Sequence, residues 1–84
     1  MGKIKMLELD VLKPHEPILP YFAEELTNIA HVTEVNIHVT DMDVETQKIK
    51  ITILGNDIEY EDVCNIIEKN GGSIHSVDKV SAGN

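Results

Sequence analysis

The stretch TEVNIHVTDMDVETQKIKITIL, residues 33–54, contains two alternating runs separated by a polar turn. In residues 35–39 and again in residues 49–53, valine or isoleucine occupies every second position, and the residues between them are polar or charged. Successive side chains of a strand point to opposite faces of a sheet, so each run predicts a strand that is buried on one side only. Two such runs joined by a short polar segment predict an antiparallel hairpin.

The segments on either side of this hairpin complete a regular order of elements. Residues 4–12 alternate like a half-buried strand, and residues 17–30 carry apolar side chains at a spacing of three and four, which predicts an amphipathic helix that begins at Pro17 or at Pro20. A second such helix is predicted to start within the signals from Asn56 to Glu59 and to end at the glycine pair at 71 and 72. The residues around SIHSVDKV, 73–80, form a last strand without clean alternation, which is typical of a sheet edge.

The order βαββαβ predicts one ferredoxin-like domain of the α+β class over residues 1–84, a four-stranded antiparallel sheet with two helices on one face. The first and third strands should be central. The other sheet face should be open and polar, carrying Glu8, Asp10, His38, Lys48 and Lys50. RNA-recognition sheets need aromatic side chains at such positions, so this class of module is excluded.

Composition argues against nucleic-acid-binding, membrane-spanning, secreted and disulfide-linked proteins. The chain has 15 acidic residues and 7 lysines, a formal charge of −8, so nucleic acid is not an expected partner. No apolar run approaches the roughly 20 residues that a membrane-spanning helix needs. Charged residues interrupt the N-terminal apolar stretch, unlike a secretory signal, and we therefore expect a cytoplasmic protein. Cys64, the single cysteine, leaves no intrachain disulfide.

The turn DMDVE offers three carboxylates, Asp41, Asp43 and Glu45, at alternate positions. Such oxygens suit a hard cation, calcium or magnesium. The segment is not an EF-hand, because Thr46 stands where that loop needs glycine and Thr52 stands where it needs glutamate. A solvated polar turn without a metal is the alternative interpretation.

The corner LDVLKPHEP, residues 9–17, raises a separate question. Pro14 removes a backbone donor and should end the first strand, and Pro17 suits the entrance to a helix. Glu16 would favour the positive end of the helix dipole. His15 has no such explanation, and we interpret His15 and Glu16 as a candidate ligand or subunit contact.

No catalytic signature is present in the sequence, neither a glycine-rich phosphate loop nor a nucleophile elbow. Cys64 falls on the apolar stripe of the second helix, where it should pack as a small hydrophobic residue. A non-enzymatic role is therefore favoured. A metal-assisted enzyme that uses Asp10, His15 and Glu16 is the weaker alternative.

Three segments together resemble a known family: LDVLKPHEP, VNIHVTDMDVETQKIKITILG and GGSIHSVDKVSAG. The chain is similar over nearly its whole length to the small archaeal family called domain of unknown function two hundred and eleven. The resemblance implies a ferredoxin-like fold, no established activity, and homo-oligomers that include rings. Pro20 departs from the family pattern and leaves the start of the helix open.

These observations lead to two hypotheses about function. The first is a non-enzymatic, cytoplasmic homo-oligomer whose acidic clusters bind calcium or magnesium. The second is a regulatory domain that senses a small molecule bound between subunits, near the KPHEP corner.

Overall fold

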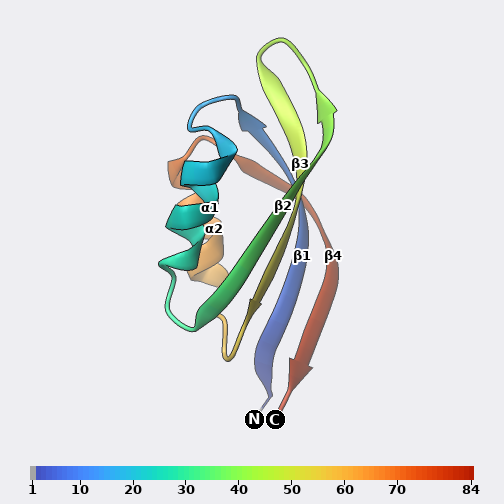
Figure 1. Cartoon of the computed structure of the whole chain (residues 1–84). Coiled ribbons are helices and arrows are strands. Elements are labelled where there is room, and N and C mark those ends of the chain that lie inside the picture. Colours follow the sequence, from blue (N-terminus) through green and yellow to red (C-terminus); the bar gives the residue numbers. More distant parts are fainter. Residues whose placement is uncertain (1) are drawn as a thin grey trace.

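The computed structural model describes residues 2–84 and has the predicted order of elements. The elements are β1 (Lys3–Pro14), α1 (Leu19–Thr27), β2 (Val32–Met42), β3 (Thr46–Gly55), α2 (Tyr60–Lys69) and β4 (Ser73–Gly83). The strands form one antiparallel sheet in the order β2-β3-β1-β4, and both helices lie on the same face of it (Figure 1). The prediction of a ferredoxin-like α+β fold is confirmed, with β1 and β3 central and β4 at an edge.

The core lies between the helices and the central strands. It is formed by alternate residues of β1 and β3 together with side chains from both helices and the loops that follow α1 and β3: Leu7, Leu9, Val11, Phe22, Leu26, Ile29, Ile49, Ile51, Ile53, Ile58, Val63 and Ile67. Register pairs Leu9 with Ile51, so the apolar positions of both strands face the same side. The alternation in the sequence therefore identified the buried face correctly.

Helix α1 begins later and ends earlier than its periodicity suggested. Its N-cap is Ile18, and Pro20 lies in the first turn, where a backbone N–H would have no partner inside the helix. Pro17 thus lies outside the helix.

At the end of α2, Gly71 has a positive φ of 80°, and the N–H groups of Gly71 and Gly72 donate hydrogen bonds to the carbonyl oxygens of Glu68 and Ile67, which confirms the predicted glycine stop.

Strand β4 lacks alternation because its pairing with β1 is interrupted. Register shifts occur between Glu8 and Leu9 and again between Asp10 and Val11. At each of these places β4 contains one additional residue, Asp78 and His75 respectively, which stands opposite no residue of β1. A β-bulge re-aims side chains and breaks the period of two, so the pattern of SIHSVDKV could not reveal its own register.

The two helices are shorter than the strands that they cover. At 1.5 Å per residue, α1 and α2 are about 14 Å long, whereas a strand of 11 residues spans about 36 Å. The helix-side face of the sheet therefore extends beyond the ends of the helices that cover it.

Candidate functional site

The KPHEP corner is organised by a buried lysine. Lys13 continues the inward alternation of β1, and its side chain is only 1% exposed. Its ammonium donates hydrogen bonds to the carbonyl oxygens of Pro14 (2.7 Å) and Pro17 (2.6 Å) and lies 5.2 Å from the centre of the Phe22 ring. Burial lowers the pKa of Lys13, and the negative charge of Glu16 partly opposes this shift. Lys13 therefore links the two prolines of the KPHEP corner through hydrogen bonds from its buried side chain.

His15 connects this corner to the β2–β3 hairpin. Its Nε2–H donates to the carbonyl oxygens of Asp43 (2.8 Å) and Val44 (3.1 Å), 28 and 29 residues away. A carbonyl oxygen only accepts hydrogen bonds, so Nε2 carries the proton in this arrangement. The structure thus gives His15 a contact within the chain, and its predicted role in ligand or subunit contact stays a prediction.

Glu16 does not act on the helix dipole, and that interpretation is wrong. It lies two residues before the N-cap Ile18, and the first turn of α1 contains no acidic residue. The dipole effect is confined to the terminal turn, which Glu16 does not reach. Its charge acts on Lys13 instead.

Two of the carboxylates of the DMDVE turn accept hydrogen bonds from the backbone of the turn. One Asp41 oxygen accepts the N–H of Met42, and one Asp43 oxygen accepts the N–H of Val44, each at 2.8–2.9 Å. Within residues 2–84, no three carboxylate, histidine or cysteine side chains are placed to hold one metal ion. Binding of calcium or magnesium by Asp41, Asp43 and Glu45 therefore stays a prediction that rests on the sequence.

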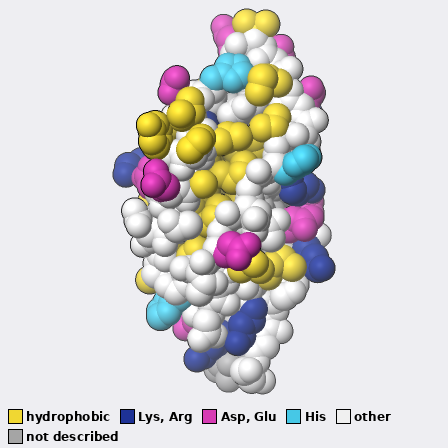
Figure 2. Space-filling view, viewed as in Figure 1, with side chains coloured by type: hydrophobic (Ala, Val, Ile, Leu, Met, Phe, Trp, Pro, Cys, Tyr) yellow, Lys and Arg dark blue, Asp and Glu magenta, His cyan; other side chains and the backbone are white. Residues whose placement is uncertain are grey.

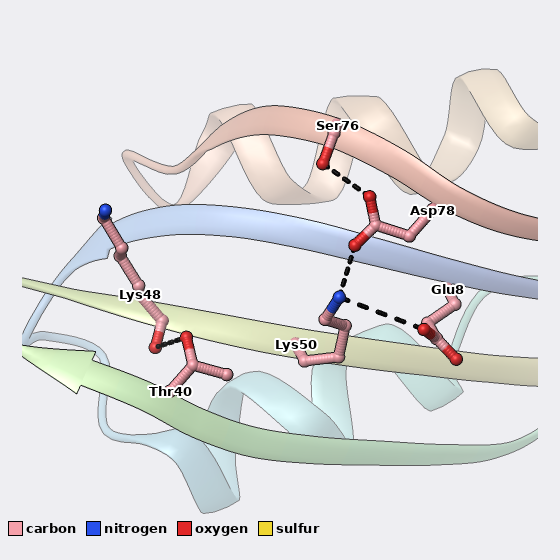
Figure 3. Close-up of polar contacts among 6 residues, drawn as sticks. All are labelled: Glu8, Thr40, Lys48, Lys50, Ser76 and Asp78. Atoms are coloured by element: carbon pink, nitrogen blue, oxygen red, sulfur yellow. Dashed lines mark hydrogen bonds and ion pairs between the residues drawn. The ribbon is translucent and has the colours of Figure 1, made fainter.

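The open face of the sheet carries an ion-pair network at its centre (Figure 3). The ammonium of Lys50 hydrogen-bonds to Asp78 and lies 3.9 Å from Glu8, and Asp78 also accepts a 2.6 Å hydrogen bond from Ser76. Asp78 is one of the two additional residues of β4, so the bulge supplies the partner of Lys50. The prediction of a polar, mixed-charge open face agrees with this arrangement.

Asp78 should make stability depend on acid pH. The hydrogen bond from Lys50 lowers the pKa of Asp78 below its ordinary value of 3.8. A carboxylate with a lowered pKa stabilises the folded state above the unfolded pKa, and this contribution disappears as pH falls through the folded value. In urea unfolding monitored by circular dichroism, wild type should be more stable than Asp78→Asn at neutral pH, and the difference should close below the ordinary pKa. A difference that persists in acid would contradict the assignment.

Two apolar surfaces flank the helices, one at each edge of the sheet. The first, which we call the α1–β2 groove, is formed by Leu19, Val35, Ile37, Val39 and Met42; the first four pack against the core but stay partly exposed. Met42 stands opposite buried Gln47, hence on the helix side, and is 61% exposed. Figure 2 shows hydrophobic side chains that run between the helices and β2.

The second surface, which we call the α2–β4 margin, is a hollow of about 270 Å³. It is lined only by apolar or aromatic residues, Ile4, Leu7, Tyr60, Val77 and Val80. Val77 and Val80 are 43% and 51% exposed. Both edge strands thus have uncovered apolar side chains on their helix side.

Sequence reasoning missed the two buried polar residues, Lys13 and Gln47. They are paired across β1 and β3 at the end of the core. Lys13 lies two residues after Val11, and Gln47 lies two residues before Ile49. The period of two therefore already placed both residues on the buried face. A lysine and a glutamine are rarely buried without partners, and for this reason they are easily read as exposed.

None of the helices in the described part of the chain is long and apolar enough to cross a membrane. The family model of DUF211, described as Uncharacterized ArCR, matches residues 5–84. An uncharacterised protein of Methanocaldococcus jannaschii is 45% identical over 83 residues, which cover 99% of this chain and 86% of that relative.

Proposed function

Because the chain belongs to DUF211, an archaeal family described only as uncharacterised, we propose its role from geometry: it is a non-enzymatic protein that assembles with copies of itself along the edges of its sheet. The observation that carries this proposal is the pair of uncovered apolar surfaces, the α1–β2 groove and the α2–β4 margin. Exposed apolar patches on small domains are typical of interaction sites.

The direction of the strands is compatible with contact between unlike edges. Neighbouring strands are antiparallel throughout the order β2-β3-β1-β4, so β4 runs opposite to β2. A second copy in the same orientation would therefore place its β2 antiparallel to β4 of the first, and its α1 beside α2. This contact joins the groove of one copy to the margin of another, which is a heterologous interface that closes into a ring when the rotation permits.

The polar residues of the corner support a structural role for that segment. Lys13 and His15 are both engaged in contacts within the chain, which leaves the KPHEP corner as a rigid connection between β1, α1 and the hairpin. Calcium or magnesium binding, small-molecule sensing between subunits and a cytoplasmic location stay predictions from the sequence.

Val77→Lys should break the assembly. A lysine at this 43% exposed position places a charge in the apolar α2–β4 margin, where a subunit interface would have to desolvate it. In sedimentation equilibrium at micromolar concentration, wild type should exceed the 9.4 kDa of one chain and Val77→Lys should sediment as the monomer. Asn65→Lys, an exposed position on α2, is the matched control and should assemble like wild type.

Mixing two variants tests the contact between unlike edges. Val77→Lys retains an intact groove, and Met42→Lys retains an intact margin, so each alone should be monomeric while their mixture should form a dimer. A monomeric wild type would overturn the proposal of assembly. Two variants that stay monomeric when mixed would contradict the heterologous contact.

A further inference from the structure

A small hollow on the open face lies beside the bulge at His75. It has a volume of about 70 Å³ and is lined by Asp10, Val11, Leu12, Lys48 and His75, with mostly apolar atoms at its surface. A second hollow of about 250 Å³ continues from it toward the hairpin, and the two share Leu12 and Lys48. Asp41 and Thr46 are among the residues that line this second part. We call the two together the open-face groove.

The bulge in β4 forms one wall of the groove. Asp10 pairs with Ser76 and Val11 pairs with Ile74, so His75 stands opposite no residue of β1 and its side chain lines the small hollow. Bulges are over-represented at sheet edges and next to active sites, where they re-aim a side chain or end the pairing of strands. The floor includes Leu12, an exposed apolar residue on a sheet face whose neighbouring outward positions are charged.

The charges of the groove are not satisfied by one another. Lys48 stands directly opposite Asp41 in the β2–β3 register, yet neither residue belongs to any of the ion pairs formed within residues 2–84. Lys50, two residues further along the same strand, is paired with Glu8 and Asp78. In Figure 3 the Lys48 side chain extends over β1, and its ammonium meets none of the other side chains drawn.

From this placement we propose that the open-face groove binds a small α-amino acid with a short branched apolar side chain. The carboxylate of the ligand accepts from the ammonium of Lys48, and its own ammonium donates to the free carboxylate oxygen of Asp41. The apolar side chain enters the small hollow over Leu12. A zwitterion is the ligand that satisfies one cation and one anion that are adjacent but unpaired, and whose apolar part suits the floor between them.

Other ligand classes fit the groove less well. A nucleotide would bring several negative charges to a chain whose formal charge is −8, and the hollow beside His75 is too small for a base. An isolated divalent cation would be repelled by the ammonium of Lys48, which lines the groove together with the carboxylates. The proposal does not rest on assembly, since every residue of the groove comes from one chain.

The test is to titrate the full chain with L-valine and to monitor its backbone amides in ¹⁵N–¹H correlation spectra. Two analogues of the same carbon skeleton serve as comparison: isovalerate lacks the ammonium, and isobutylamine lacks the carboxylate. We expect saturable shifts of the Leu12, Lys48 and His75 amides with valine at about 10 mM, tenfold above a millimolar Kd. Both analogues should bind at least tenfold more weakly.

Lys48→Met should weaken valine binding at least tenfold, and so should Asp41→Asn. Lys50→Met is the matched control, because Lys50 is engaged with Glu8 and Asp78, and it should retain the wild-type affinity. The proposal is overturned by equal binding of valine and either analogue, by unchanged affinity in Lys48→Met, by shifts that map to the α1–β2 groove or the α2–β4 margin, or by no saturable shift at all. Sedimentation of the same samples reports the assembly separately.

Discussion

Gly55→Ala is expected to destabilise the fold by about 3 kcal/mol, at the upper end of the effects of overpacking. Gly55 is the last residue of β3, where the chain approaches the start of β2. A Cβ atom at this position would lie 2.2 Å from the carbonyl oxygen of His31 and 2.9 Å from a side-chain carbon of buried Ile58. The first neighbour is backbone, so the clash is relieved only if β2 and β3 separate at this end.

The same displacement would break a hydrogen bond. The N–H of Asn56 donates to the His31 carbonyl at 2.9 Å, and His31 already has a positive φ of 70°. Thermal unfolding followed by circular dichroism should show a fall in Tm of more than 10 °C, at about 4–8 °C per kcal/mol for a domain of this size.

Gly83→Ala is the matched control for this prediction. A Cβ at Gly83 meets nothing within 4 Å, so the same substitution should change stability by less than about 0.5 kcal/mol. Equal effects of the two substitutions would contradict the close approach at Gly55.

The parts of the fold that were predictable depend on strict periodicity. Residues 35–39 and 49–53 alternate without interruption, and the structure places Ile49, Ile51 and Ile53 in the core. A period of two assigns the faces of such a strand without knowledge of its partner. For this reason the central strands, the covered face and the polar open face could be read from the sequence.

Strand β4 marks the limit of that reasoning. Its bulges arise where β1 and β4 lose register, and this depends on pairing between residues about 65 positions apart in the sequence. The role of Asp78 as partner of Lys50 and the position of His75 in the open-face groove both follow from these bulges. Neither could be read from SIHSVDKV alone.

The corner shows a similar limit. The prolines explained why the strand ends, but the partners of His15 lie in the hairpin turn and become neighbours only in the folded chain. The helix-dipole interpretation of Glu16 depended on the first residue of α1, and helix ends are the least predictable part of an amphipathic segment. Lys13 was recognisable by parity, since it continues the buried side of β1.

Lys13→Met is the second substitution with a large expected effect. Methionine keeps the length and most of the apolar stem, so packing against Phe22 is retained and the loss is confined to the ammonium. The carbonyl oxygens of Pro14 and Pro17 lose their donor, and the cation–π contact with Phe22 is lost. Hydrogen bonds to a charged group contribute about 1.5–3 kcal/mol, and removing a buried charge offsets part of this, so we expect a net loss of about 2 kcal/mol at neutral pH.

The size of this loss should increase at alkaline pH. Burial lowers the pKa of Lys13 in the folded chain below its ordinary 10.5. At pH values between the folded-state and the unfolded-state pKa, the unfolded chain therefore retains the proton on Lys13 when the folded chain has lost it. Stability from this group therefore rises as pH increases through that window, whereas methionine does not titrate. The difference in unfolding free energy between wild type and Lys13→Met, measured by urea denaturation, should be larger at about pH 10 than at pH 7.

Lys48→Met is the matched control for Lys13→Met, because it makes the same substitution at an exposed position. Lys48 is exposed on the open face, and its replacement should change the free energy of unfolding by less than about 0.5 kcal/mol at either pH. If Lys13→Met were as stable as wild type at neutral pH, the ammonium would not hold the corner. If the difference shrank as pH rose, the pKa of Lys13 would be raised rather than lowered.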